Sequence, residues 1–214
     1  MSYVLKRSAN VAPFNSSRVT LGALVGLAAI WTAMLLLGTG GLDQRLLLSI
    51  YAADTPLLAL IAMGFTYFGS WYSVVLITIA GSIFLYFQQG IRPAVLLMAA
   101  SLSARLMVIL QKAYFARLRP EESLQLVEVH YQSFPSGHSA NPLVAFLMLA
   151  LLAAPPVKRN LAVGIAILLA ALIGISRPML GVHWPSDVVA GWAFGLAWVL
   201  LWMWLANRAV RRGT

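Results

Sequence analysis

Residues 19–38 read VTLGALVGLAAIWTAMLLLG, an apolar run without a charged side chain. A helix of about 20 mainly apolar residues is long enough to cross the hydrocarbon core of a bilayer. The run is longer than the roughly 7–15 apolar residues of a cleaved secretory signal, and further apolar runs follow it. It therefore predicts a retained membrane-spanning helix.

Outward from this helix, five further apolar segments follow, each bounded by polar residues, glycine or proline. Of the 214 residues, 61% are hydrophobic and 10% are charged, a balance far from that of soluble domains. The expected spans are residues 71–87, 93–111, 138–154, 160–175 and 187–206. The sequence therefore predicts an all-α polytopic bundle of about six transmembrane helices, forming one integral membrane domain over residues 1–214.

The region between the first two spans, residues 39–70, does not fit this pattern. Asp43, Arg45 and Asp54 interrupt its first half, and its apolar part, residues 57–68, is too short to span comfortably. Counting it as a span would also disturb the charge asymmetry of the loops. We therefore expect an interfacial or re-entrant segment here.

Lysine and arginine are unevenly shared between the two sides of this topology. If the N-terminal segment, residues 1–18, and the tail, residues 207–214, are cytoplasmic, nine of the 15 basic residues lie in the cytoplasm, as the positive-inside rule requires. All six acidic residues then lie on or near the outer side. The net charge of +9 thus reports orientation, and we expect no nucleic-acid partner. The cytoplasmic basic residues are Lys6, Arg7, Arg18, Arg92, Lys158, Arg159, Arg208, Arg211 and Arg212.

Three short polar stretches lie at the outer ends of the third to sixth spans. Because the topology puts them on one side of the membrane, we expect them to meet. They are Lys112 followed by Arg119-Pro120, then Pro135-Ser136-Gly137-His138, and finally Ser176-Arg177 followed by His183 and Asp187.

Five residues of these stretches suit the binding of a phosphate ester. Lys112, Arg119 and Arg177 supply positive charge, and arginine adds forked donors that match phosphate geometry. Ser136 and Gly137 precede an apolar helix, whose first backbone N–H groups favour an anion. Without cysteine, thiolate metal sites are excluded, and the sequence predicts a phosphate pocket that uses neither a metal nor another cofactor.

Two histidines can divide the chemistry, one attacking phosphorus and the other protonating the departing oxygen. Asp187 follows His183 by four residues, so a carboxylate can orient that ring as a nucleophile. Pro185 leaves open whether the contact comes from a regular helix or from a helix-start turn. We therefore predict His183 as the nucleophile, Asp187 as its partner and His138 as the general acid.

With these residues the sequence resembles the type-2 phosphatidic acid phosphatases, the PAP2 superfamily, and among them the bacterial integral-membrane lipid phosphatases. The family signature is K-x6-RP, PSGH and SR-x5-H-x3-D, and every fixed position is matched between Lys112 and Asp187. The resemblance implies phosphate binding by the lysine, both arginines, the serine and the glycine. It also implies acid catalysis by the first histidine and a phosphohistidine intermediate on the second.

Other polar residues are weaker candidates. Arg105 lies within the third span, seven residues before Lys112, where a charge is costly. One hypothesis is that Arg105 makes a second contact with a diphosphate or a headgroup. The alternative, which we favour, is that its side chain snorkels to the surface or bonds a carbonyl between helices. Arg117 is either a helper or a surface charge, and His130 is left out of the catalytic set.

The leading functional hypothesis is hydrolysis of a lipid phosphate or diphosphate at the outer membrane interface. The compact chain favours a bacterial inner-membrane enzyme acting on undecaprenyl diphosphate, phosphatidylglycerol phosphate or phosphatidic acid. Transfer of the phosphoryl group to another lipid and non-catalytic transport of an anionic lipid are the alternatives. Two Gly-x3-Gly pairs, residues 22 and 26 and residues 191 and 195, are expected to serve packing within the chain rather than a dimer. The sequence does not determine the oligomeric state.

Overall fold

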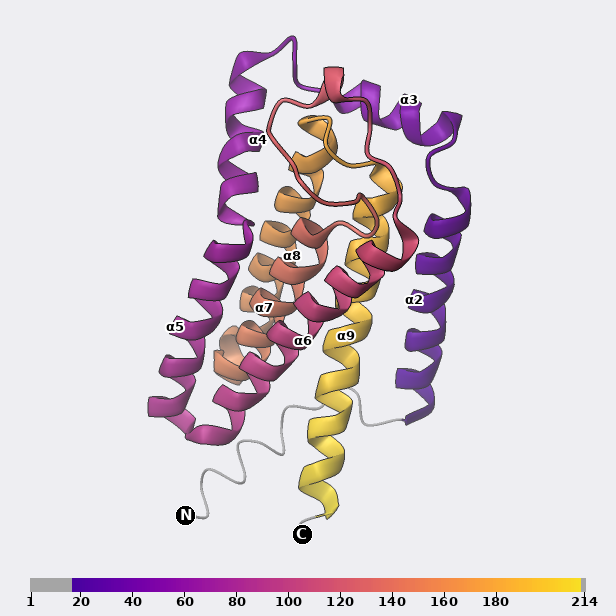
Figure 1. Ribbon diagram of the computed structural model, residues 1–214. Coiled ribbons are helices and arrows are strands. Elements are labelled where there is room, and N and C mark those ends of the chain that lie inside the picture. Colours follow the sequence, from indigo (N-terminus) through magenta and orange to yellow (C-terminus); the bar gives the residue numbers. More distant parts are fainter. Residues whose placement is uncertain (1–16, 213–214) are drawn as a thin grey trace.

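The computed structural model describes residues 17–212, in which eight α-helices and one short 3-10 helix account for the regular structure (Figure 1). The prediction of an all-α chain is confirmed. The elements are α2 (Ser17–Leu37), α3 (Gly41–Ile50), α4 (Pro56–Phe68), α5 (Trp71–Gln89), α6 (Ile91–Phe115), η1 (Glu122–Leu124), α7 (Gly137–Ala153), α8 (Pro156–Met179) and α9 (Pro185–Arg212).

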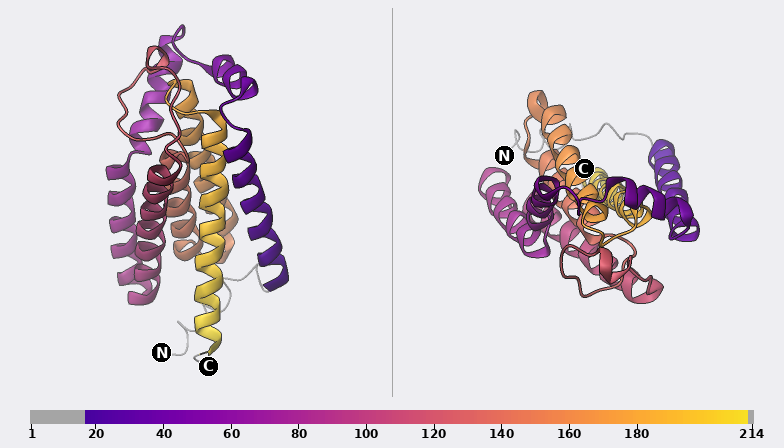
Figure 2. Two further views of the ribbon diagram at one scale, coloured as in Figure 1. Left: turned by 45° about the vertical axis from the view of Figure 1, so that its right-hand side comes forward. Right: turned by 90° about the horizontal axis from the view of Figure 1, so that it is seen from above.

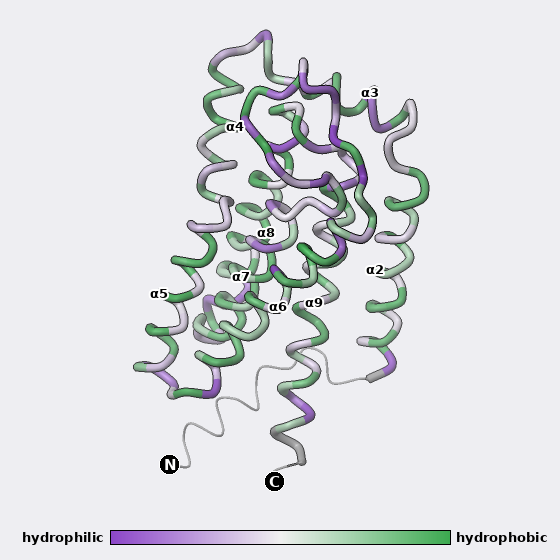
Figure 3. The backbone as a smooth tube through the Cα atoms, in the orientation of Figure 1, coloured by the Kyte–Doolittle hydropathy of each residue, from purple (hydrophilic) through white to green (hydrophobic). Residues whose placement is uncertain are grey.

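Five of the described helices, α2, α5, α6, α8 and α9, are long and apolar enough to cross a membrane. Large apolar side chains such as Leu21, Phe87 and Leu161 are exposed along them, as a lipid-facing surface requires. Figure 3 shows the hydrophobic residues along these helices in green. The chain is therefore an integral membrane protein. The remaining expected span, residues 138–154, is also a helix, α7, but it has only 17 residues, and it packs against α6, α8 and α9.

Helix α7 is apolar on most of its surface because it lies at the centre of the bundle. Residues 139–148 are buried apart from Asn141, which is half-buried. The prediction of close packing within the chain is confirmed for Gly191 and Gly195 of α9, since a Cβ on Gly191 would lie 2.6 Å from the carbonyl oxygen of Ser136. It is wrong for Gly22 and Gly26, where a Cβ would meet nothing within 4 Å.

The region 39–70, predicted as an interfacial or re-entrant segment, forms two helices, α3 and α4. Helix α3 lies across one end of the bundle, and α4 runs along α8 toward the start of α5 (Figures 1 and 2). The chain bends between α4 and α5 at Gly69, where a Cβ would lie 2.1 Å from the Ile173 side chain, so glycine permits the close approach to α8. Whether α3 and α4 are interfacial or re-entrant stays a prediction.

The two ends of the bundle differ in content. One end carries α3, the long loop 116–136 and the turn 180–184, whereas the start of α2, the end of α9 and the α5–α6 and α7–α8 turns lie at the other (Figure 1). Arg92, Lys158 and Arg208 belong to that second end, in agreement with the predicted grouping of basic residues. Lys6 and Arg7 lie outside the described residues.

Candidate active site

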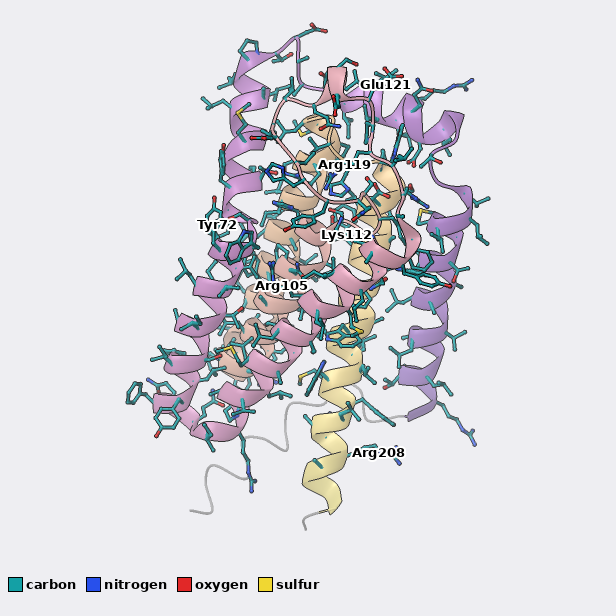
Figure 4. The ribbon with its side chains drawn as sticks, viewed as in Figure 1. Tyr72, Arg105, Lys112, Arg119, Glu121 and Arg208 are labelled. Carbon is teal, nitrogen blue, oxygen red and sulfur yellow. The ribbon has the colours of Figure 1, made fainter. Side chains whose placement is uncertain are left out.

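The three motif stretches meet at the end of the bundle that carries α3. Lys112 lies in the last turn of α6, and Arg119 in the loop that follows (Figure 4). Residues 136–138 begin α7, Arg177 lies in the last turn of α8, and His183 and Asp187 flank the start of α9. The main chain joins two of these pieces directly, because the Ser136 N–H donates to the carbonyl oxygen of Asp187 at 3.0 Å.

The turn before α9 fixes the position of His183. Gly181 has a φ of 70°, and a Cβ there would lie 2.0 Å from the carbonyl oxygen of Leu124, so this turn requires glycine. Pro185 begins α9, where its missing N–H costs no helical hydrogen bond. Asp187 accepts the Trp184 N–H at 3.0 Å through Oδ2, as a first-turn carboxylate does in a capping box. The contact between His183 and Asp187 therefore comes from a helix-start turn.

Hydrogen bonds determine which nitrogen of His183 is free. Its Nδ1 lies 3.3 Å from Asp187 Oδ2 and 3.2 Å from Ser133 Oγ, and the ring is almost completely buried. Ser133 donates its only hydroxyl proton to Asp187 Oδ2 at 2.5 Å, so toward His183 it can only accept. Nδ1 therefore carries the ring proton, which leaves the lone pair on Nε2.

Asp187 is held on its other side by Arg117. The guanidinium donates to Asp187 Oδ1 at 2.9 Å, and both side chains are largely buried. Its second nitrogen donates to the carbonyl oxygens of Met34 and Leu35 at the end of α2, at 3.0 and 2.6 Å. Arg117 also lies over the Phe134 ring, 4.2 Å from its centroid. Of the two readings of Arg117, the structure supports the helper and not the surface charge.

Helix α3 reaches the same network through Asp43, which is buried. Asp43 accepts the Ser186 backbone N–H at 2.9 Å and the Ser186 hydroxyl at 2.5 Å. Ser186 in turn lies 3.1 Å from an Arg117 nitrogen. A carboxylate at the first turn of α9 caps its free N–H groups and stabilises the helix start that carries Asp187.

Two of the predicted phosphate-binding cations are oriented by backbone carbonyls of the loop 116–136 and of the turn 180–184. Lys112 Nζ donates to the carbonyl oxygens of Gln132 and, at 3.1 Å, Ser133. Arg119 donates to the carbonyl oxygens of Tyr131, at 2.6 Å, and Val182. Burial lowers the pKa of Arg119 to about 10, which leaves it cationic at neutral pH. Neutral acceptors thus hold both cations without cancelling their charge.

The third cation, Arg177, is anchored by α4. One guanidinium nitrogen donates to Thr66 Oγ1 at 2.7 Å, and that hydroxyl also lies 3.1 Å from Ser176 Oγ. The half-buried His138 contacts the backbone of Thr66. Buried polar atoms without a hydrogen-bond partner in the described part of the chain include Arg177 Nε and Ser136 Oγ. Both belong to the predicted phosphate-binding set, and unpaired buried donors of this kind suit a polar ligand.

The electrostatic surroundings of His183 predict its protonation state. Burial lowers the pKa of His183 well below 6.5, and nearby cations, Arg119 first, lower it further. Below pH 6.5 His183 binds a proton in the unfolded chain but stays neutral in the folded chain. Protonation therefore stabilises the unfolded state, and the free energy of unfolding decreases as the pH falls. We expect the wild type to lose more thermal stability in detergent between about pH 7.5 and about pH 5 than a His183→Gln variant does. Identical pH dependences would contradict a neutral, buried His183.

Arg105 lies apart from this cluster. Arg105 lies deeper in α6, where its guanidinium stacks 5.1 Å from the Trp71 ring centroid (Figure 4). It joins none of the hydrogen bonds described above.

Among residues 17–212, no group of three or more His, Cys, Asp or Glu side chains could hold a metal ion. The absence of a cofactor stays a prediction.

Four residues of the site were not assigned from the sequence: Ser133, Arg117, Asp43 and Thr66. Arg117 offered the only signal, as a charge between two motif cations. Ser133 and Thr66 are common polar residues in unremarkable surroundings. Asp43 lies some 140 positions from its partner Ser186, a pairing that local spacing cannot indicate.

Comparison with known proteins agrees with this geometry. The model of the PAP2 superfamily matches residues 90–211, which contain all three motif stretches. Phosphatidylglycerophosphatase B of Bacillus subtilis (strain 168) is 33% identical over 147 residues, 66% of this chain and 71% of that protein. Lipid A 1-phosphatase of Rhizobium johnstonii is 46% identical over 71 residues, but these cover only 33% of this chain and 26% of that protein.

A crystal structure supports the fold separately. The transmembrane PAP2 type phosphatidylglycerolphosphate phosphatase from Bacillus subtilis superposes with a TM-score of 0.79, covering 86% of this chain and 96% of its own. At 24% identity this likeness shows the fold alone. The family model matches more than half of the chain, and the first relative is matched over most of its length. The chain belongs to the PAP2 superfamily, within its branch of membrane lipid phosphatases.

Proposed function

We propose that this chain hydrolyses the phosphate of a lipid by a metal-independent mechanism with a phosphohistidine intermediate on His183. The observation that carries the proposal is the hydrogen bonding of Nδ1 to Asp187 and Ser133, which leaves Nε2 as the free nucleophilic nitrogen. A buried imidazole with its proton held on the far nitrogen is ready to attack without first losing a proton.

The remaining motif residues fit the needs of the transition state. Lys112, Arg119 and Arg177 can balance the charge on the non-bridging oxygens, and the unpaired Ser136 hydroxyl and Arg177 Nε supply further donors. The N-terminus of α7 adds backbone N–H groups at Gly137 and His138. Their placement at one end of the bundle suits a headgroup at the membrane surface with its tails in the bilayer.

The reaction proceeds in two displacements. The Nε2 lone pair of His183 attacks phosphorus, the bond from phosphorus to the lipid oxygen breaks, and His138 gives that oxygen its proton. Water then attacks the phosphohistidine, passing a proton to His138. The phosphorus–nitrogen bond breaks, inorganic phosphate leaves, and the Nε2 lone pair is restored. Asp187 stabilises the positive charge that the ring carries in the intermediate.

The substrate class follows from the relatives. The name of the first relative favours phosphatidylglycerol phosphate, and phosphatidic acid and undecaprenyl diphosphate are the other two candidates. The grouping of Arg92, Lys158 and Arg208 at the far end of the bundle supports cytoplasmic termini and a site at the outer face. We therefore place the protein in a bacterial cytoplasmic membrane with its site facing outward.

An assay of the purified protein in detergent tests the proposal. Phosphate release is measured from phosphatidylglycerol phosphate, phosphatidic acid and undecaprenyl diphosphate, with EDTA and with a labelled phosphate group. We expect free phosphate from at least one lipid, at a rate that EDTA leaves within about twofold. Chelator inhibition reversed by added metal would contradict the metal-free mechanism. Transfer of the labelled phosphate to an acceptor lipid would show that the protein is a phosphotransferase rather than a hydrolase. If no lipid is turned over, non-catalytic transport of an anionic lipid becomes the favoured function.

A further inference from the structure

A small cavity with a mainly apolar lining lies between α5, α6 and α7, deeper in the bundle than the motif residues. Its polar lining residues are Arg105 and Ser101 of α6, Asn141 of α7 and Thr78 of α5. We call it the Arg105 pocket. Trp71 and Leu102 also line it, and both are largely exposed on the lipid-facing surface. The pocket thus lies where a lipid beside the bundle can reach it.

Several polar groups of the pocket have no partner. Ser101 is more than nine-tenths buried, and its hydroxyl, which can donate, has no hydrogen-bond partner among the described residues. The guanidinium of Arg105 stacks on the Trp71 ring and forms neither a hydrogen bond nor an ion pair with the described residues. Unsatisfied polar groups in a bilayer-embedded helix are costly, so a ligand that bonds them gains free energy. Packing between the helices alone would not require polar side chains at these positions.

Asn141 of the pocket lies close to the helix start that carries the proposed phosphate site. Asn141 follows His138 by three residues, and its Nδ2 lies 3.5 Å from the position that a Cβ on Gly137 would take. Asn141 is also the one residue of the stretch 139–148 that is not fully buried. Arg105 precedes Lys112 by two helical turns, a rise of about 10 Å. A substrate held by Lys112 therefore extends past Asn141 toward Arg105 on its way into the bilayer.

Size and depth identify the group that fits. The cavity measures about 20 Å³, which admits one or two water-sized groups and not a whole phosphate. The second phosphorus of a diphosphate shares an oxygen with the first and stays near Lys112, whereas the ester carbonyls of a glycerolipid lie further along the chain. These carbonyls are small acceptors, and Arg105, Ser101 and the Asn141 amide can each donate to them.

We propose that the Arg105 pocket is a subsite for the ester carbonyl groups of a diacylglycerol phosphate substrate. The inference rests on the proposed phosphatase function and deepens it, because it selects acyl-ester lipids over polyprenyl and ether lipids. A guanidinium bonded to a carbonyl in a low-dielectric setting contributes more than a neutral donor does. Through this subsite the intramembrane charge of Arg105 makes the enzyme selective for acyl-ester lipids.

The test compares phosphatidic acid with its dialkyl ether analogue, which has the same phosphate and tails but no carbonyls. We expect the wild type to hydrolyse the ester with a kcat/KM about tenfold higher. In Arg105→Met this ratio should fall close to one, and in Ser101→Ala it should fall by about threefold, as for one neutral hydrogen bond. Arg208→Met is the matched control, since Arg208 also stacks on a tryptophan, Trp204, but at the far end of the bundle.

Each outcome decides the matter. A ratio near one in the wild type, or a ratio unchanged in both pocket variants, overturns the subsite, as does an equal fall in the Arg208→Met control. If Arg105→Met impairs only undecaprenyl diphosphate, or if the wild type accepts only that lipid, the ester assignment is wrong. If Arg105→Met does not fold, Ser101→Ala carries the test alone. Failure of the phosphatase function itself is distinct, because the wild type would then release phosphate neither from the two analogues nor from undecaprenyl diphosphate.

Discussion

Replacement of His183 by alanine is expected to lower phosphate release by about 10⁴-fold or more, because no other group in the cluster is placed to form the covalent intermediate. The variant should remain folded, since the cavity left behind is lined by polar groups that water can satisfy. Turnover is measured with the best lipid from the assay above, and the intermediate is sought as acid-labile phosphate on a peptide that contains His183.

His130→Ala is the matched control, because His130 is an exposed histidine in the loop at the same end of the bundle. We expect this variant to retain activity within about twofold, as most surface substitutions do. Rapid turnover by His183→Ala, or trapped phosphate on a peptide that contains His138, would exchange the roles of the two histidines. A fall of only about tenfold would assign His183 to binding rather than to bond formation.

The sequence predicts that the motif residues meet, because they sit at helix ends that the hydropathy pattern locates. Lys112 ends one apolar helix and His138 begins another, so topology alone brings them to one end of the bundle. Element boundaries were less accurate. Helix α8 runs through Ser176 and Arg177 to Met179 rather than ending at residue 175, because Arg177 is buried against α4 and does not face solvent.

The supporting network could not be derived from the sequence, for a physical reason. Ser133 acts through one hydroxyl whose direction depends on the fold of the whole loop 116–136. Asp43 acts from α3, which belongs to the region for which the sequence predicts only an interfacial or re-entrant segment. Hydropathy places segments in depth but does not give the rotation of one helix against another. That rotation decides whether α3 and α4 cover the site, as they do.

Substitution of Arg117 by methionine is expected to reduce both stability and activity. Loss of one partner from a buried ion pair typically costs about 3–5 kcal/mol, because the remaining charge, here Asp187, is left uncompensated. The loop 116–136 also loses its bonds to the end of α2. With Asp187 less firmly held, the His183 ring is less well oriented, and we expect kcat to fall by about 10- to 100-fold, as when partners that orient metal-bound histidines are removed. Thermal unfolding and turnover, measured well below the melting temperature, report the two effects separately.

Arg117→Lys and Arg45→Met separate positioning from general damage. Lysine restores the positive charge but cannot bond Asp187, Ser186 and two carbonyls at once, because it lacks the planar fork. It should therefore recover much of the stability and less of the kcat. Arg45 is an exposed arginine of α3 at the same end, and its loss should leave both quantities near wild type. If Arg117→Met melted and turned over like the wild type, Asp187 would need no partner, and the tie between α2 and the catalytic turn would have no catalytic consequence.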